Sequence, residues 1–431
     1  MAVADLHRAV VMRLAVLAAA VLALGIAAPA AAAPDEDRLG KSLGYPIAKI
    51  GNNKDWFYDE SVRVGSFTHQ AEIPGLFQGG VNVLRPSDKP MPLGKAGREP
   101  DYRWSTGADR DLSVDDFLAR QRIMGLLIVK DGVVQVERYQ YDRKPTDRFT
   151  SQSMAKSITA LAVGYALEEG RIASLDDRAE RYAPKLRGTV FGDTTIRNLL
   201  RMASGARYAQ SYDRTGDSPA FSAAISRDGI EGAARFVTAR ETEQGARFYY
   251  ASPHTAMLAA VLRGATGMSL SEYLGPRLWQ GIGAEESALW RTDRTGLELA
   301  FGNFNATLRD YARLGVVLAN DGVRPDDPAA RRVIPLEFLL EATDWKRVPE
   351  AFRPGKASPY LGYGYQFWTY PGERRRFAML GVYGQSVFVD PGQRLVIVQT
   401  GANATAEAGG TSLARERDAF WRGVMRYYDK R

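Results

Sequence analysis

The chain has 431 residues, a formal net charge of +7 and no cysteine. Without cysteine it can form no disulfide, no thiolate nucleophile and no cysteine-based zinc site. The basic residues are interspersed with acidic ones and form no basic face with interleaved aromatic residues, so the sequence does not indicate nucleic-acid binding.

The N-terminus has the pattern of a secretory signal peptide. Arg8 and Arg13 precede a long apolar run, and the small residues 30–33 follow it. We therefore predict a signal peptide over residues 1–33 and a periplasmic or secreted mature protein. An uncleaved membrane anchor is the alternative, but the apolar run is shorter than the ~20 residues that a membrane span needs. We expect no stable membrane insertion after cleavage.

The first part of the mature chain has few periodic elements. Residues 35–112 are rich in Gly, Pro and short polar segments, which predicts loops and short strands wrapped around the main body. A helix is predicted over 113–122, because two aspartates fall in its first turn. Two apolar strands follow, 126–129 and 133–136, as a hairpin around an Asp-Gly turn.

The middle of the chain is mainly helical. A helix over residues 153–169 carries apolar residues at helical spacing and ends at Gly170. Helical patterns then dominate a segment of about 175–300, which we interpret as an insertion. The helices predicted in and just after it are 195–202, 229–238, 253–264 and 301–320.

The C-terminal third returns to strands and closes with an amphipathic helix over 412–428. Because strands near both ends of the chain flank a helical middle, we predict an α+β fold. One antiparallel sheet flanked by helices, together with the mainly helical insertion, would form a single domain of residues 34–431. The C-terminal strands are predicted at 364–370, 377–382, 386–390 and 395–400.

The stretch Ser153-Met154-Ala155-Lys156 is a candidate nucleophile and base. A serine hydroxyl attacks poorly until a neighbouring group takes its proton, and a lysine three residues later lies one helical turn away on the same face. Alone, the tetrapeptide is short enough to arise by chance. The alternative interpretation is a helix N-terminus with a capping serine and a solvated lysine.

Tyr250 precedes a predicted helix and is a second candidate. A tyrosine ordinarily has a pKa near 10, and a nearby lysine ammonium would favour its phenolate. It could then relay a proton between Ser153 and a leaving group. The alternative, an aromatic packing cluster before the helix, is the stronger interpretation for the adjacent Tyr249.

A third candidate is the run Gly381-Val382-Tyr383-Gly384-Gln385 at a strand edge. Glycines there let a substrate carbonyl approach backbone N–H groups, which stabilise the negative oxygen of a tetrahedral intermediate. The alternative is a bulged strand whose glycines only relieve crowding.

Other chemistries have weaker signals. His69 and His254 are the two histidines left after the signal peptide and lack metal-ligand spacing, so we predict no metal and no other cofactor. The Gly-x-Ser-x-Gly pattern at residues 40–44 lacks the preceding strand that a nucleophile elbow requires. His254 could pair with a serine, but no acidic partner can be identified from the sequence.

Taken in order, these motifs resemble the serine β-lactamase and penicillin-recognising family. Ser-x-x-Lys, a Tyr-x-Ser element and a glycine-containing strand correspond to the three signatures of that family. The resemblance is strongest to the class C-like branch that includes 6-aminohexanoate-dimer hydrolase and related esterases. It extends over about residues 121–402, and within this range the segments 149–152, 174–177, 195–205 and 389–391 support it.

The resemblance implies a role for each matching residue. Ser153 would be the nucleophile, Lys156 its activating base and Tyr250 a proton-transfer group. Backbone N–H groups of Ser153 and Gln385, beside Gly384, would form the oxyanion hole. Tyr212 resembles a tyrosine that closes over amide substrate in the oligomer hydrolase.

Two positions depart from the family pattern. Ser252 stands where β-lactamases and peptidases have Asn, and Val382-Tyr383 stands where they carry Lys or His. Without that cation, docking of a substrate carboxylate lacks its usual partner. We therefore expect a secreted hydrolase of small ester or amide substrates rather than a β-lactamase or D-Ala-D-Ala peptidase. The alternative is a catalytically silent binding or sensory protein of the same fold. The sequence does not indicate an oligomeric state.

Overall fold

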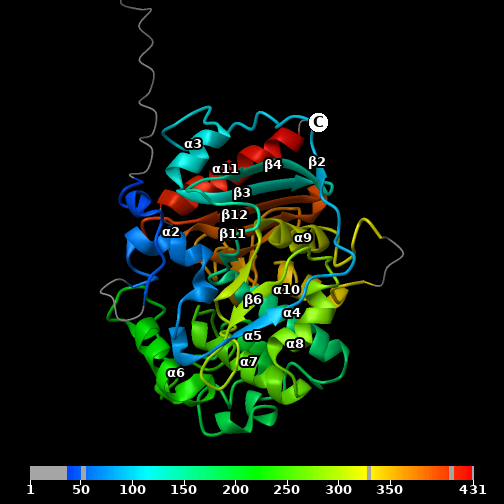
Figure 1. Cartoon of the computed structure of the whole chain (residues 1–431). Coiled ribbons are helices and arrows are strands. Elements are labelled where there is room, and N and C mark those ends of the chain that lie inside the picture. The colour runs from blue at the N-terminus through cyan, green and yellow to red at the C-terminus, as the bar shows by residue number, and fades with distance from the viewer. Residues whose placement is uncertain (1–35, 50–54, 328–331, 407–411, 430–431) are drawn as a thin grey trace, which may run out of the picture.

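The computed structural model describes residues 36–49, 55–327, 332–406 and 412–429, so the predicted signal peptide lies outside the described residues. An eight-stranded sheet with the order β2-β4-β3-β12-β11-β10-β9-β8 forms the upper half of the molecule (Figure 1). Its neighbours are antiparallel, apart from the parallel pair β2 and β4. The strands are β2 Gly94–Lys95, β3 Ile123–Lys130, β4 Val133–Tyr139, β8 Gly362–Tyr363, β9 Trp368–Thr369, β10 Phe377–Gly381, β11 Gln385–Asp390 and β12 Leu395–Gly401.

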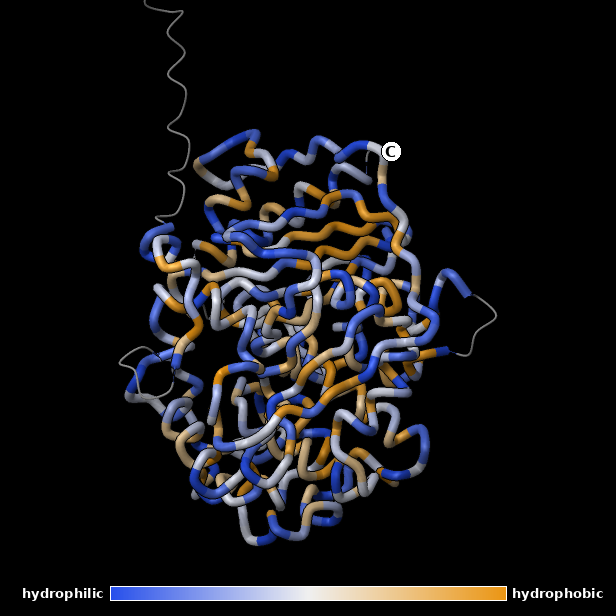
Figure 2. The backbone as a smooth tube through the Cα atoms, in the orientation of Figure 1, coloured by the Kyte–Doolittle hydropathy of each residue, from blue (hydrophilic) through white to orange (hydrophobic). Residues whose placement is uncertain are grey.

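Helices cover both faces of this sheet. In β3, Leu127 and Val129 belong to the large core shared with α4 and α9, whereas Leu126 and Ile128 pack on the opposite face with α3 and α11 (Figure 1). A strand buried on both faces has no polar alternation, so β3 and β12 appear as hydrophobic bands in Figure 2. These helices are α3 Val114–Arg120, α4 Met154–Glu168, α9 Leu308–Ala319 and α11 Ser412–Asp429.

The segment between α4 and α9 forms the lower, helical half of the molecule (Figure 1). Its helix α7 packs against α4, α5 and α6, and α10 also packs against α4. No helix in the described ranges is both long and apolar enough to cross a bilayer. The helices of this segment are α5 Ile196–Leu200, α6 Asp217–Ala233, α7 Ser252–Thr266 and α8 Leu270–Leu274, whereas α10 Leu336–Thr343 follows α9.

A second, four-stranded antiparallel sheet was not predicted. Its order is β1-β6-β7-β5, and β5 leads directly into the turn before α4. The helix predicted over 301–320 is wrong at its start, because residues 304–306 pair as β7 and Thr307 caps α9 by accepting from the backbone N–H of Asp310. The strands are β1 Val81–Leu84, β5 Phe149–Thr150, β6 Ala288–Arg291 and β7 Phe304–Ala306.

Other predicted boundaries also need correction. The loops and short strands predicted over 35–112 include a helix, α2 Glu60–Thr68, whose residues from Val62 onward are all buried. Helix α6 begins twelve residues before the predicted 229–238 and bends at Gly229, where φ is 72°. The predicted strand 364–370 is broken by Gln366, whose left-handed backbone has a φ of 62°.

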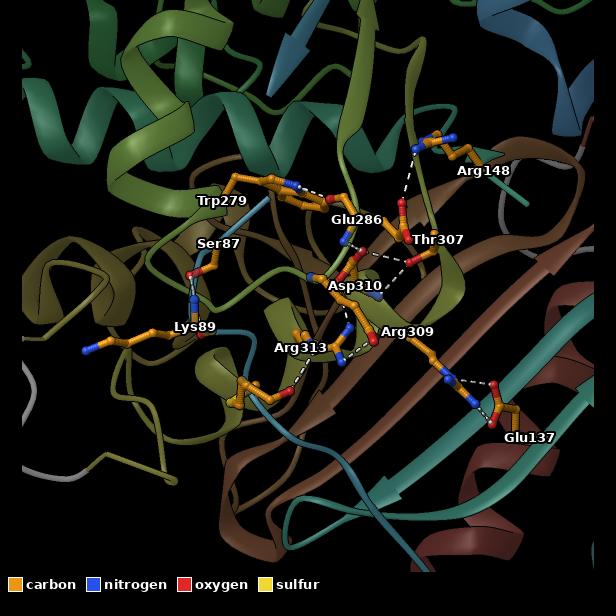
Figure 3. A network of polar contacts seen from close by, with 12 residues as sticks. Ser87, Lys89, Glu137, Arg148, Trp279, Glu286, Thr307, Arg309, Asp310 and Arg313 are labelled. Carbon is orange, nitrogen blue, oxygen red and sulfur yellow. Dashed lines mark hydrogen bonds and ion pairs between the residues drawn. The ribbon is translucent and has the colours of Figure 1, made fainter. Parts of the chain in front are cut away.

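Asp310, in the first turn of α9, joins this helix to the loop before β6 through a buried polar network (Figure 3). Its carboxylate accepts from the backbone N–H groups of Glu285 and Glu286, from the Thr307 hydroxyl and from the Arg313 guanidinium, at 2.8–3.1 Å. These donors compensate for the desolvation of a buried carboxylate. The network therefore fixes the loop before β6 on the first turn of α9.

Candidate active site

Ser153 lies at the head of α4, directly after a strained turn. The chain leaves β5, and the Ser151 N–H donates to the Phe304 carbonyl at 2.7 Å. Gln152 then adopts a left-handed conformation with φ of 45°, which is costly for a residue with a side chain. Ser153 follows as the N-cap of α4 and is half-buried, so its hydroxyl is presented at the turn rather than enclosed in the core.

Lys156 lies one turn further along α4, and its Nζ atom is 2.9 Å from the Oγ of Ser153. The same Nζ donates to the Phe301 carbonyl at 2.8 Å, and the lysine is 1% exposed. Burial lowers the pKa of Lys156 to about 7, because desolvation disfavours the ammonium form. A substantial fraction of the amine is therefore neutral near pH 7 and able to accept a proton from Ser153.

Tyr250 lies beside the same hydroxyl. Its phenol group is hydrogen-bonded to the Ser153 side chain, and its ring centroid is 5.1 Å from the Nζ of Lys156. The ring stacks on Trp368 at 5.6 Å. Burial raises the pKa of Tyr250 well above its ordinary value, so the expected phenolate is wrong. The lysine does not oppose this effect strongly, because its own pKa is lowered by burial.

The third motif forms the turn between β10 and β11. Gln385 opens β11, and its side-chain Nε2 donates to the Gly401 carbonyl at 2.8 Å and the Tyr383 carbonyl at 3.1 Å. Gly384 has a φ of 94°, and an added Cβ there would lie 2.8 Å from the Oδ1 of Asn403. The side chain of Gln385 is thus occupied by contacts within the sheet, which leaves its backbone N–H as the group that could face a substrate.

The side chain of Tyr383 packs within a group of aromatic side chains. Its backbone has a φ of 61°, and its ring lies 5.0 Å from Phe57 and 5.5 Å from Phe67. The guanidinium carbon of Arg63 lies 4.2 Å from the Tyr383 ring centroid. Val382 beside it is buried. Because neither valine nor tyrosine has a cationic side chain, these two residues supply no cation to the site.

Tyr212 and Ser252 are brought to the same region. The ring centroid of Tyr212 lies 6.3 Å from that of Phe57, and Tyr212 interacts electrostatically with Tyr250. Burial raises the pKa of Tyr212 to about 12. Ser252 is buried in the first turn of α7, and its N–H donates to the side-chain carbonyl of Gln210 at 2.8 Å.

The competing serine motifs are separate from this group. Ser42 lies exposed in a short helical turn, and the described residues directly before it, 36–40, form a turn and not a strand. His254 pairs with Ser204, its Nε2 lying 2.7 Å from that hydroxyl, but both side chains are buried and burial lowers the pKa of His254 to about 4. We interpret this pair as a neutral structural contact. Within the described ranges, no three His, Cys, Asp or Glu side chains are grouped as metal ligands.

Several residues at the site were missed by the sequence analysis. The Phe301 carbonyl that accepts from Lys156 is a backbone group, so no residue type marks it. Gln210 links the amide of Ser252 to Tyr212 through hydrogen bonds of its side chain. Phe57 comes from the poorly patterned N-terminal segment and reaches the site only through the tertiary fold.

The β-lactamase family model matches residues 111–412. The chain belongs to the β-lactamase family. This confirms the resemblance drawn from the three motifs and the predicted α+β class. Membership places the protein among the hydrolases of the serine β-lactamase superfamily.

Three relatives show how far the similarity extends. The 6-aminohexanoate-dimer hydrolase of Paenarthrobacter ureafaciens is 28% identical over 308 residues, which cover 70% of this chain and 78% of the relative. A solved structure from Bacillus anthracis, described as a candidate 6-aminohexanoate-dimer hydrolase, has a TM-score of 0.74 at 25% identity and covers 88% of this chain and 98% of its own. A hydrolase with promiscuous acyltransferase activity shares the fold, with a TM-score of 0.53, 18% identity and coverage of 71% and 99%.

Proposed function

We propose that this protein hydrolyses ester or amide bonds through an acyl-enzyme intermediate on Ser153. The observation that carries the proposal is the 2.9 Å contact between the Oγ of Ser153 and a buried lysine whose pKa is about 7. A merely solvated lysine beside a helix cap would have no reason to be buried. Desolvation of a lysine destabilises the fold, and the use of the neutral amine as the base that activates a serine nucleophile would account for this burial.

The reaction begins with proton transfer from Ser153 to the neutral amine of Lys156. The Oγ atom attacks the substrate carbonyl carbon, and the oxygen of the tetrahedral intermediate is held by the N–H groups of Ser153 and Gln385. The bond to the leaving alcohol or amine then breaks, and Tyr250 passes a proton to that group as a neutral phenol, regaining one from the Lys156 ammonium. Water repeats the sequence on the acyl-enzyme and releases the acid.

The substrate class follows from what the third motif lacks. Val382 and Tyr383 supply no cation, which disfavours a substrate that must dock a carboxylate there. This supports esters and amides over β-lactams and D-Ala-D-Ala peptides. Similarity to a 6-aminohexanoate-dimer hydrolase favours small amides in particular.

We also propose that the protein acts in the periplasm or outside the cell, on the strength of the basic, apolar and small-residue order at its N-terminus. N-terminal sequencing of protein from each cell fraction tests this. A mature N-terminus near residue 34 in the periplasm or medium supports export, and an intact Met1 in the cytoplasm contradicts it.

Covalent labelling tests the nucleophile. A fluorophosphonate probe should add one label per chain, detected by intact mass spectrometry, and Ser153→Ala should abolish it. Ser42→Ala is the matched control, since Ser42 is exposed and lies outside the site, and it should label normally. If the wild type neither labels nor hydrolyses p-nitrophenyl esters, the catalytically silent binding protein becomes the better interpretation.

A further inference from the structure

The N-terminal segment 55–59, outside the region matched by the family model, is fastened to the loop that carries Tyr212. The Tyr58 hydroxyl donates to the Asp213 carbonyl at 3.3 Å, and Arg214 pairs with Asp59 at 3.2 Å. The guanidinium of Arg214 also lies 4.6 Å from the Tyr58 ring centroid. These contacts hold two segments together that are more than 150 residues apart in sequence.

The same segment orients Phe57 toward the site. The Asp55 carboxylate accepts from the backbone N–H groups of Phe57 at 2.8 Å and Tyr58 at 3.2 Å, which shapes the turn. Phe57 then lies between Tyr383, in an edge-to-face contact, and Tyr212. We call Phe57, Tyr212 and Tyr383 the aromatic rim.

The aromatic rim is continuous with the nucleophile. Tyr212 interacts with Tyr250, which is hydrogen-bonded to Ser153, and Tyr383 stands two residues before Gln385. An acyl group held at Ser153 therefore has the rim as one of the apolar surfaces within its reach, on the side of Tyr250 and Tyr212. Phe57 and Tyr212 are half-buried and so retain surface that a ligand could cover.

The guanidinium that stacks on the aromatic rim, that of Arg63, already has hydrogen-bond partners within the protein. Arg63 is 2% exposed, and its terminal nitrogens donate to the Asn403 carbonyl at 2.6 Å and the Tyr58 carbonyl at 2.9 Å. With its guanidinium stacked on Tyr383, it supports the rim from behind. A substrate carboxylate placed against the rim would lose its hydration without gaining this partner.

We propose that Phe57 is a specificity residue and that the aromatic rim binds the uncharged, apolar part of the acyl substrate, such as a methylene chain or a ring. The inference rests on the proposed hydrolase function and names its substrate class. Each methylene buried against the rim should raise kcat/KM about fourfold. A carboxylate at the same distance from the scissile bond should lower it.

Three activated esters test this with the full mature chain: p-nitrophenyl acetate, p-nitrophenyl hexanoate and the mono-p-nitrophenyl ester of glutarate. In the wild type we expect kcat/KM to be highest for the hexanoate. Phe57→Ala should lower the hexanoate-to-acetate ratio by about tenfold, and Phe57→Leu, which stays apolar, by less. Tyr360→Ala is the matched control, because Tyr360 is 45% exposed and packs on Tyr370 away from the rim, and its ratio should be unchanged.

Each result decides something. An unchanged ratio in folded Phe57→Ala or Phe57→Leu protein, checked by circular dichroism, would overturn the role of Phe57. A glutarate ester cleaved as well as the hexanoate would overturn the uncharged substrate class. Both outcomes leave the Ser153 chemistry standing. In contrast, a wild type that cleaves none of the esters and takes no fluorophosphonate label removes the hydrolase proposal and this inference with it.

Discussion

A Cβ atom added to Gly381 would lie 2.6 Å from the carbonyl oxygen of Ser151. It would also lie 2.9 Å from the Cβ of Gln152, the residue before the nucleophile, and 3.0 Å from the Cβ of Gln385, its partner in the β10–β11 ladder. The glycine therefore lets the third motif touch the turn that presents Ser153. We infer that this close approach positions the N–H groups of Ser153 and Gln385 that are proposed for the oxyanion hole.

Gly381→Ala should consequently lower kcat by roughly 100-fold, the cost of displacing one oxyanion donor. Because the nearest atoms are backbone and Cβ atoms, the strand must shift to accommodate a methyl group. Steady-state kinetics on a p-nitrophenyl ester measures the loss. Gly107→Ala is the matched control, since a Cβ there meets nothing within 4 Å, and its kcat should equal that of the wild type. Equal activity in both variants would show that the close approach has no catalytic role.

The pH dependence of kcat/KM should follow the protonation of Lys156. The neutral amine is the active base and its pKa is about 7, so activity should rise with pH and level off above about pH 8. Lys156→Ala should lower kcat/KM by about 10³-fold or more and remove this limb. A profile without an inflection near pH 7 would contradict the assignment of Lys156 as the base.

The buried Lys156 should also destabilise the folded state at pH values where its protonation differs between the folded and unfolded chain. Its pKa falls from 10.5 in the unfolded chain to about 7 in the folded one, so between these values the unfolded chain binds more protons. The free energy of unfolding should rise with pH over that interval. Lys156→Met should be more stable than the wild type at pH 7, and the difference should shrink by pH 10. Thermal unfolding at both values measures it; a constant difference would contradict the lowered pKa.

Tyr250→Phe should lower kcat/KM by about 10²-fold while leaving the limb near pH 7 in place. The pKa of Tyr250 is raised well above its ordinary value, so the phenol should stay protonated throughout the working range. The pH profile of the wild type should therefore show no second inflection between about pH 8 and 10. An inflection there that disappears in Tyr250→Phe would be the titration of Tyr250. Finding such an inflection would restore the phenolate role expected from sequence.

The protonation of His254 should affect the stability of the fold in mild acid, and it should not affect the catalytic activity. Its pKa is lowered to about 4, whereas an unfolded histidine has its ordinary value of 6.5, so stability should be lost as pH falls from about 6.5 to 4. The total over that range is ~3 kcal/mol for this group alone. His254→Gln should flatten that dependence in urea unfolding and keep the kinetic limb near pH 7. Loss of that limb would instead indicate a Ser-His mechanism.

Local patterns predicted much of the fold. The hairpin around Asp131 and Gly132, the helix after Ser153 and the strands from Phe377 to Gly401 form within a few residues of the expected positions. Their signals, apolar runs and turn residues, act between neighbours in the chain. Helix α2 and strand β7 were missed because their conformation depends on partners far away in sequence.

The sequence by itself determined the family, because the order of Ser153, Lys156, Tyr250 and the third motif depends on residue types alone. The same residue types are the basis of the chemistry proposed for the site. Tertiary structure alone decided the protonation of the site. Burial, rather than spacing, lowers the pKa of Lys156 and raises that of Tyr250, and desolvation depends on everything packed around a group. The tertiary structure also places Phe57, which comes from a segment without a motif, beside Tyr383. Side chains distant in sequence meet only when the chain is folded.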